Sequence, residues 1–264
     1  MVNDALLTSE GLRACLPLAM KHIGRRLLLV EQTGSTNQDV ISLAEQGEAG
    51  GLVLVAERQS DGRGRLGRCW HTLPDSLAVS ILLRPALALQ QVPQLSLLMA
   101  VALHDVLKVY LPELTIKWPN DLIYDGAKLA GILSEMRSGA VSPPAVVLGF
   151  GINLKPPVEG YPSDVSQAAI DLATASGCSI SRLHLLAALL GSVDQWYELY
   201  LQQGFQPVRE AWWQAHAASD QPVRVYDGRS YIYGIAKKLD QDGALLLETA
   251  HGIERIIAGE LEII

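Results

Sequence analysis

Cysteine is scarce in this sequence, and no segment has the pattern of an export signal or a membrane span. The three cysteines, Cys15, Cys69 and Cys178, are odd in number and far apart, which excludes a disulfide framework and a zinc knuckle. The first residues, MVNDALLTSEGL, lack the basic start and apolar core of a signal peptide. The longest apolar stretch, at residues 95–103, is too short to cross a bilayer. We expect a soluble protein of the cytoplasm with no membrane partner.

Positive charge is also in deficit. Lysine and arginine number 21 against 28 aspartates and glutamates, which gives a formal net charge of −7. This is the wrong sign for a dedicated nucleic-acid binder, so any contact with DNA or RNA has to be local. Of the 264 residues, 49% are hydrophobic and 19% are charged, enough apolar material for a large core. The length allows one large domain, or a main domain with a small appendage.

Common catalytic motifs are absent as well. The sequence contains no G-x-S-x-G, H-E-x-x-H, Walker A or C-x-x-C pattern, and its six histidines show no metal-ligand spacing. Nothing therefore favours a covalent nucleophile or a structural metal. A reaction that needs only positioning and the neutralisation of charge is consistent with these absences.

Hydrophobic periodicity divides the chain into a larger part with mixed elements and a small β-rich part. Strands are predicted at residues 25–32, 51–57, 77–85, 115–118, 121–136 (a hairpin) and 145–154, and helices at 39–46, 93–110, 181–204 and on to 216. After residue 219, short alternating strands with turns at Asp227-Gly228 and Asp242-Gly243 indicate a small antiparallel barrel. We expect an α+β domain over residues 1–218 and an all-β domain over residues 219–264.

One segment is rich in arginine although the chain is acidic. Residues 62–68 read GRGRLGR, and Trp70 follows, so guanidinium groups alternate with residues that let the backbone bend and approach a ligand. We interpret it as a loop over an anion such as a phosphate or an activated carboxylate. GRGRLG also fits G-x-G-x-x-G, but residues 69–75 contain Pro74 and predict no helix to hold a pyrophosphate. A solvated glycine turn and an RNA-binding arginine-glycine segment are the alternatives.

The segment KWPND, at residues 117–121, predicts the end of a strand. Pro119 forces Trp118 towards an extended conformation and stops strand pairing. Asn120 and Asp121 then stand at a strand end, where they can face a ligand or a metal ion. An ordinary Pro-Asn-Asp turn is the alternative.

Three further motifs place polar residues beside apolar runs. Lys128 begins KLAGILSE, Asn153 ends a strand through GFGIN, and Ser35-Thr36-Asn37 precedes a predicted helix. The glycines of GFGIN allow close approach of another backbone or of a ligand. Taken singly, the three motifs can also be a snorkelling strand-end lysine, a strand terminus and a helix cap.

In order along the chain, STN, GRGRLGR-x-W, KWPND, K-x-x-GIL and G-x-GIN resemble the biotin protein ligases (biotin–acetyl-CoA-carboxylase ligases). The resemblance runs from residue 28 to the C-terminus, and the five motifs in this order and spacing are highly specific. It implies a class II synthetase-like fold shared with lipoate ligases: a mixed β-sheet flanked by helices, then a small SH3-like β-barrel. It also implies two reactions. Biotin and Mg-ATP give biotinyl-5′-AMP and pyrophosphate, and a specific lysine of the biotin carboxyl carrier protein of acetyl-CoA carboxylase then attacks the adenylate.

The resemblance implies site residues too. The first reaction brings a carboxylate up to the α-phosphate, and cationic side chains can offset this repulsion. The predicted catalytic residues are Lys128 and Arg65. The residues predicted to bind biotin are Ser35, Thr36, Asn37, Gln59, Arg63, Gly64, Arg65, Lys128 and Gly131. Those predicted to bind ATP are Arg63, Arg65, Arg68, Trp70, Lys117, Asn120, Asp121 and Asn153, with Asp121 also holding Mg²⁺. The glycine-rich loop and residues 154–165 are expected to cover the adenylate and exclude water.

This sequence departs from the family pattern at three places. Asp61 stands where alanine is common, which adds a negative charge that can pair with an arginine and weaken nucleotide binding. After Trp70, HTLPDSL is shorter than the usual Ser-Pro and Gly-Asn-Leu segment. The first predicted strand begins at residue 25, which leaves too little sequence before it for the DNA-binding domain of relatives that repress biotin genes. We therefore expect no DNA partner. Family members often pair through the sheet and the glycine loop, so a homodimer is a hypothesis here.

Three other functions are alternatives. A lipoate or octanoyl transferase has the same fold, although GRGR and KWPND resemble the biotin branch. A non-catalytic biotin-binding module would not need Asn120, Asp121 or Arg68. Use of lipoate in place of biotin tests the first, and retention of biotin that depends on ATP tests the second. A DNA-binding repressor is more distant, and the absence of a salt-sensitive DNA shift would remove it.

Overall fold

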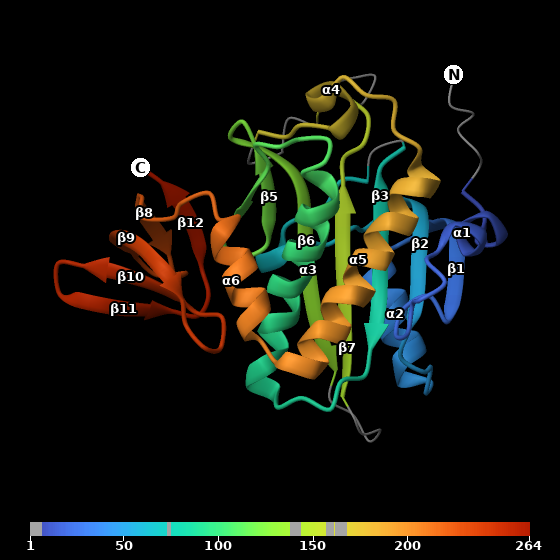
Figure 1. Ribbon diagram of the computed structural model, residues 1–264, viewed down its shortest axis with the longest axis horizontal. Helices are drawn as coiled ribbons and strands as arrows, with labels where there is room; N and C mark the ends of the chain where they lie inside the picture. The colour runs from blue at the N-terminus through green and yellow to red at the C-terminus, as the bar shows by residue number, and fades with distance from the viewer. Residues whose placement is uncertain (1–6, 73–74, 138–143, 157–160, 162–167) are drawn as a thin grey trace.

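A seven-stranded sheet forms the main layer of the computed structural model, which describes residues 7–72, 75–137, 144–156, 161 and 168–264 (Figure 1). The strand order is β1-β2-β3-β7-β6-β5-β4. β1 and β2 are parallel and the other pairs are antiparallel, so the sheet is mixed, as predicted. The strands are β1 (Arg26–Thr33), β2 (Leu52–Gln59), β3 (Leu77–Leu83), β4 (Thr115–Lys117), β5 (Asp121–Tyr124), β6 (Ala127–Arg137) and β7 (Ala145–Ile152).

Helices cover both faces of this sheet. α3 (Val92–Leu107), α5 (Arg182–Gln203) and α6 (Gln206–Gln214) lie on the face turned to the viewer in Figure 1. α2 (Thr36–Glu45) packs on the opposite face, against β2, β3 and β7. α1 (Ser9–Cys15) packs against α5 and β1, and α4 (Leu172–Ser176) follows the loop after β7. Because both faces are covered, the central strands read as continuous apolar runs.

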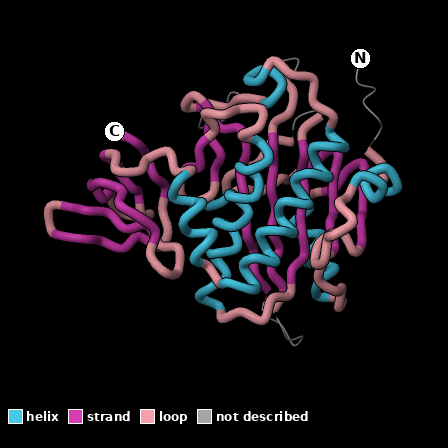
Figure 2. The backbone as a smooth tube through the Cα atoms, in the orientation of Figure 1, coloured by secondary structure: helices cyan, strands magenta, loops and turns pink. Residues whose placement is uncertain are grey.

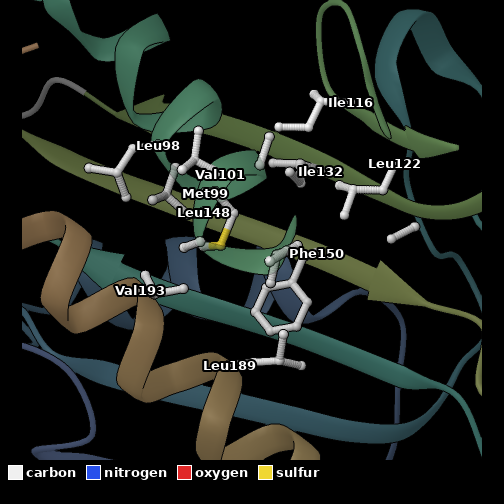
Figure 3. Close-up of a cluster of buried hydrophobic side chains, with 14 of the residues drawn as sticks. Leu98, Met99, Val101, Ile116, Leu122, Ile132, Leu148, Phe150, Leu189 and Val193 are labelled. Atoms are coloured by element: carbon white, nitrogen blue, oxygen red, sulfur yellow. The ribbon is translucent and has the colours of Figure 1, made fainter. Parts of the chain in front are cut away.

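The larger apolar core lies between the sheet and α3 and α5. Figure 3 shows Met99 of α3 and Leu189 of α5 facing Leu148 and Phe150 of β7. A smaller core on the other face joins Val40 and Ile41 of α2 to Leu52, Leu54, Leu82, Ala145 and Val147. Alternate residues of one strand therefore belong to different cores, as the two-residue period of a strand requires.

The C-terminal strands form a second, five-stranded antiparallel sheet in the order β11-β10-β9-β8-β12, drawn in magenta beside the helices in Figure 2. They are β8 (Pro222–Tyr226), β9 (Tyr231–Leu239), β10 (Leu245–Thr249), β11 (Gly252–Ile256) and β12 (Glu260–Ile263). The predicted turns are present, with Gly228 and Gly243 at φ of 99° and 93°. Such positive φ angles are adopted by glycine without steric cost. The all-β character of this segment is confirmed, and its extent as a domain, residues 219–264, remains a prediction.

Candidate active site

A cavity of about 670 Å³ lies over the α2 face of the large sheet. Every residue predicted to bind biotin or ATP lines it, although the residues come from five separate stretches of the chain. Its charged lining residues are Arg63, Arg65, Arg68, Lys117 and Lys128 against Asp121, Glu260 and Glu262. The excess of cations fits an anionic ligand. The roles assigned to the individual residues remain predictions.

Small residues on three neighbouring strands make the floor of this cavity. Gly151 of β7 pairs with Ala78 of β3 on one side and with Gly131 of β6 on the other. Two residues along β7, Gly149 pairs with Ser80 and Leu133. The first row carries almost no side-chain bulk, and in the second row Gly149 and Ser80 leave space beside Leu133. Larger groups from elsewhere can therefore lie directly on the backbone.

Two side chains use this space. A Cβ atom on Gly151 would fall 2.2 Å from the Trp70 ring, and one on Gly149 would fall 2.1 Å from Asn37 Oδ1. The sequence predicted that the glycines of GFGIN allow close approach. The structure confirms the close approach and shows that side chains make it.

The STN motif begins α2 but is more than a helix cap. Ser35 occupies the N-cap position, yet its side chain makes no capping hydrogen bond. The backbone N–H of Thr36 instead donates to Gln59 Oε1 at 2.8 Å, and Gln59 Nε2 donates to Thr72 at 3.0 Å. Gln59, at the end of β2, therefore links the start of α2 to the segment after the arginine loop. Ser35, Thr36 and Gln59 line the cavity, and we call this part of it the Thr36 end.

No α-helix follows the arginine loop in the described residues 69–72 and 75–76, as predicted, and the loop itself contains a 3₁₀ turn at Arg65–Gly67. Leu66, at the tip, has a φ of 56° and is exposed. A Cβ on Gly62 would fall 2.3 Å from the Trp70 carbonyl oxygen, so only glycine fits where the loop closes. Asp61 pairs with Arg63 at 3.3 Å, which confirms the predicted pairing. Because both side chains are exposed, the pair contributes little to stability.

Arg65 and Arg68 connect the loop to the C-terminal sheet. Arg65 Nη1 donates to Asn120 Oδ1 at 3.3 Å and to the Gly259 carbonyl at 3.4 Å. Arg68 pairs with the Glu260 carboxylate of β12. Burial lowers the pKa of Arg65, and the nearby carboxylates of Asp121 and Glu260 oppose this shift. An arginine remains charged under such conditions, so it brings a partly desolvated cation to the cavity.

Lys128 is held by an ion pair with Asp121, with 2.6 Å between Nζ and Oδ1. The pairing of β5 with β6 shifts here, since Leu122 pairs with Ala130 but Ile123 pairs with Lys128. A bulge of this kind re-aims side chains at the edge of a site. Lys128 Nζ also lies 5.8 Å from the centre of the Trp70 ring, within the range of a cation–π contact.

The amides of KWPND and GFGIN fix the backbone around the lysine. Asn120 Nδ2 donates to the Ile132 carbonyl, and Asn153 Nδ2 donates to the Ile170 carbonyl at 3.2 Å. The peptide bond between Trp118 and Pro119 is cis. β4 ends at Lys117, as the proline predicts. Asn120 therefore ties the segment before β5 to β6, and Asn153 ties the end of β7 to the segment before α4.

Trp70 Nε1 is buried and has no hydrogen-bond acceptor among the described residues. A buried indole N–H without a partner is costly, and a ligand oxygen would satisfy it. No group of three histidine, cysteine or acidic side chains that could hold a metal occurs in the part of the chain that the structure describes. Most of the expected covering loop, residues 154–165, lies outside the described residues, as does Pro74 of HTLPDSL.

Comparison with known proteins assigns the family. The model of the "Biotin/lipoate A/B protein ligase family" matches residues 29–153, and that of the "Biotin protein ligase C terminal domain" matches residues 218–263. A biotin–[acetyl-CoA-carboxylase] ligase of Paracoccus denitrificans is 32% identical over 237 residues, which cover 88% of this chain and 98% of that protein. The chain belongs to the biotin protein ligase family. A bifunctional ligase/repressor BirA of Bacillus spizizenii is 33% identical over 243 residues, covering 91% of this chain and 75% of that relative.

A solved biotin protein ligase has the same fold. The ligase of Aquifex aeolicus, in complex with biotin and ATP, superposes with a TM-score of 0.77 at 26% identity. The match covers 91% of this chain and 99% of that structure. The fold expected from the motifs is therefore confirmed. No helix within the described ranges is both long and apolar enough to traverse a lipid bilayer.

Several residues of this ligase-family site carry no motif. Ser80 and Glu135 hydrogen-bond around Asn37, and Glu260 reaches the arginine loop from β12. A buried serine within the apolar run LAVSILL was the one available signal for Ser80. Nothing in the sequence places β12 beside residues 62–68, since Arg68 and Glu260 are 192 residues apart.

Proposed function

We propose that this protein is a biotin–[acetyl-CoA-carboxylase] ligase. It activates biotin with ATP as biotinyl-5′-AMP, and it transfers the biotinyl group to a specific lysine of the biotin carboxyl carrier protein. The observation that carries the proposal is the cavity itself. There Lys128 and Arg65 share Asp121 as a neighbour, and the Thr36 and Gln59 groups line the same space. The named relatives and the ligase bound to biotin and ATP support this assignment.

In the first reaction, a carboxylate oxygen of biotin attacks the α-phosphorus of ATP, and the bond to the pyrophosphate oxygen breaks. Two anions must approach each other, so the barrier is largely electrostatic. Lys128 is held in place by Asp121 and Arg65 by Asn120, so both cations are positioned before the ligands arrive. Preorganised charge of this kind stabilises developing negative charge without further rearrangement.

In the second reaction, the neutral amine of the acceptor lysine attacks the acyl carbon of the adenylate, and AMP leaves with the bonding electrons. The mixed anhydride must be protected from water until the acceptor arrives. The Trp70 ring, lying on Gly151, and the arginines of the loop line the cavity with apolar and cationic groups that would exclude water. Lys128 and Arg65 then stabilise the departing phosphate.

Asp121 supplies one carboxylate toward Mg²⁺, beside a lysine that already pairs with it. Magnesium in nucleotide sites is commonly held by one or two carboxylates together with substrate phosphates. This donor set fits an ion that arrives with ATP, and it does not fit a resident site made of protein ligands alone. The ion would neutralise phosphate charge, and Asp121 would be its protein ligand.

The proposed partners follow from the reaction. The acceptor is the carrier protein of acetyl-CoA carboxylase, and the cytoplasm, which supplies ATP, is the proposed location. A homodimer is also proposed, and DNA is not a proposed partner because a net charge of −7 has the wrong sign for a dedicated nucleic-acid binder. Light scattering at several protein concentrations tests the dimer, and a gel-shift assay tests the absence of DNA binding.

The test is biotin-dependent exchange of labelled pyrophosphate into ATP. We expect wild type to exchange only with biotin, and Lys128→Ala and Arg65→Ala each to reduce kcat by about 10²–10³-fold, the usual effect of removing one preorganised donor. Lys108→Ala is the matched control, because Lys108 also pairs with an aspartate, at 2.5 Å, but caps the C-terminus of α3 and does not line the cavity. Exchange with lipoate in place of biotin would assign the other branch of the fold. Tight biotin binding without exchange would indicate a non-catalytic binder.

A further inference from the structure

A chain of hydrogen bonds runs behind the Thr36 end of the cavity. Asn37 Nδ2 donates to Glu135 Oε2 at 2.9 Å and to the Leu133 carbonyl at 3.3 Å. Asn37 Oδ1 lies 2.6 Å from Ser80 Oγ, which lies 2.7 Å from Thr36 Oγ1. Ser80 is fully buried, and Thr36 and Asn37 are each 4% exposed. Four side chains from α2, β3 and β6 are thus connected without solvent between them.

The hydroxyl groups of Thr36 and Ser80 make three close contacts with oxygen atoms, but they have only two protons between them. Thr36 Oγ1 also lies 3.0 Å from Gln59 Oε1, which already accepts the backbone N–H of Thr36. Asn37 presents its oxygen to Ser80, because its amide nitrogen faces only acceptors. Neither amide oxygen can supply a proton. The two shortest contacts, at 2.6 Å and 2.7 Å, both receive a proton only when Thr36 donates to Ser80 and Ser80 donates to Asn37, which leaves Gln59 with the backbone N–H.

We propose that Ser80 and Glu135 orient the Thr36 hydroxyl as a hydrogen-bond acceptor and thereby select a ligand head group that carries N–H donors. The Glu135 carboxylate polarises the Asn37 amide, which strengthens Asn37 Oδ1 as an acceptor for Ser80. The proton of Ser80 then points to Asn37, and the proton of Thr36 points to Ser80. Lone pairs of Thr36 Oγ1 and Gln59 Oε1 are left for the ligand.

The inference rests on the proposed function and specifies how the site distinguishes acids of similar size. A cyclic urea offers two N–H donors, whereas a dithiolane ring offers none and would leave the Thr36 hydroxyl oxygen without a donor in a desolvated pocket, with Gln59 Oε1 accepting only the backbone N–H. We call the hydrogen-bonded series Glu135, Asn37, Ser80 and Thr36 the relay. A buried acceptor without a donor costs more free energy than a missing contact, so the relay disfavours binding of a head group without N–H donors. Ser80 and Glu135 are positioning residues, because each acts through a neighbouring side chain.

The experiment is calorimetric titration of biotin, and separately of lipoate, into wild type, Ser80→Ala, Glu135→Gln and Ser76→Ala. Ser76→Ala is the matched control: Ser76 is also fully buried and directly precedes β3, but its hydroxyl makes no hydrogen bond within the described residues. We expect Ser80→Ala to raise the Kd for biotin about tenfold, and Glu135→Gln to raise it about threefold, since glutamine keeps the acceptor and loses the charge. Ser76→Ala should stay within about twofold of wild type.

A second measurement separates positioning from a loss of structure. In pyrophosphate exchange, Ser80→Ala should raise KM for biotin and leave kcat and KM for ATP unchanged, and its affinity for lipoate should not fall. Biotin affinity equal to that of wild type in Ser80→Ala would overturn the relay, as would equal weakening of biotin and ATP. If the wild-type protein binds no biotin, that result contradicts the proposed function, whereas loss of the difference between Ser80→Ala and wild type contradicts the relay alone.

Discussion

Replacing Gly151 with alanine puts a methyl group where the indole of Trp70 lies. The new Cβ would be 2.2 Å, 2.3 Å and 2.5 Å from Cε2, Cζ2 and Nε1 of the ring, whereas ordinary contacts begin at 3.4 Å. Gly151 lies inside β7 without a positive φ, so alanine meets no conformational strain there. The neighbouring backbone belongs to paired strands and cannot retreat. The Trp70 indole must therefore move away from residue 151.

The cost to the fold should be small beside the cost to binding. Overpacking costs about 1–3 kcal/mol, and alanine gains about 0.5–1 kcal/mol over glycine inside a strand. The net loss of stability is about 0–2.5 kcal/mol, which corresponds to a decrease of up to about 10 °C in Tm for a chain of this size. A ligand that packs against the displaced ring has to push it back. It loses the same 1–3 kcal/mol, a factor of about 5–150 in Kd.

Thermal melting and the KM values for biotin and ATP in pyrophosphate exchange measure the two effects separately. Gly34→Ala is the matched control, because no heavy atom lies within 4 Å of the Cβ it would gain. We expect Gly34→Ala to behave as wild type, and Gly151→Ala to remain folded with KM values raised at least fivefold. Wild-type KM values in a folded Gly151→Ala protein would refute the position of the Trp70 ring against Gly151.

Two predictions concern stability. Burial lowers the pKa of His216 to about 4, below the ordinary value of ~6.5 that we take for the unfolded chain, so the unfolded state binds more protons between these values. Stability should be full above pH 6.5 and fall by about 2 kcal/mol from pH 7 to pH 5 in urea unfolding; an equal fall in His216→Asn would contradict this. Leu148, fully buried between the sheet and the helices, should lose about 2–5 kcal/mol when changed to alanine, measured by urea midpoint. Val109→Ala, on an exposed side chain, should change stability by less than about 0.5 kcal/mol, and a similar loss in both variants would contradict the core assignment.

The elements of the fold could be read from the sequence, but their order in the sheet could not. Apolar runs at residues 51–57, 77–85 and 145–154 predicted strands. These strands are apolar throughout because helices cover both faces of the sheet, so neither face is exposed to solvent along them. Nothing in periodicity says that β3 pairs with β7. That pairing joins residues about 70 positions apart in sequence, and it depends on packing of the whole chain.

In the candidate site, likewise, some residues could be predicted from the sequence and others could not. Residues with a chemical signature, such as Arg65 and Lys128, could be predicted because charge next to glycine or an apolar strand is unusual. Ser80 and Glu135 could not, because their importance comes from Asn37, which reaches them only when α2 lies across the sheet. Glu260 was missed for a related reason. No feature of the sequence around Glu260, in the small β-rich segment, indicates that this glutamate forms an ion pair with Arg68.

The register of three strands explains why separate motifs make one site. Gly151 and Gly131 lie side by side in one row, and Gly149 lies beside Ser80 in the next. Residues two apart along a strand are separated by roughly 7 Å. Trp70, with Lys128 beside it, occupies the first row, and Asn37 with its relay occupies the second. A one-residue slip of β7 would turn both glycines to the other face and put Phe150 under Trp70 and Leu148 under Asn37. Groups that neutralise charge and groups that recognise a polar head are thereby held at a fixed distance, which is what activation of one particular carboxylic acid requires.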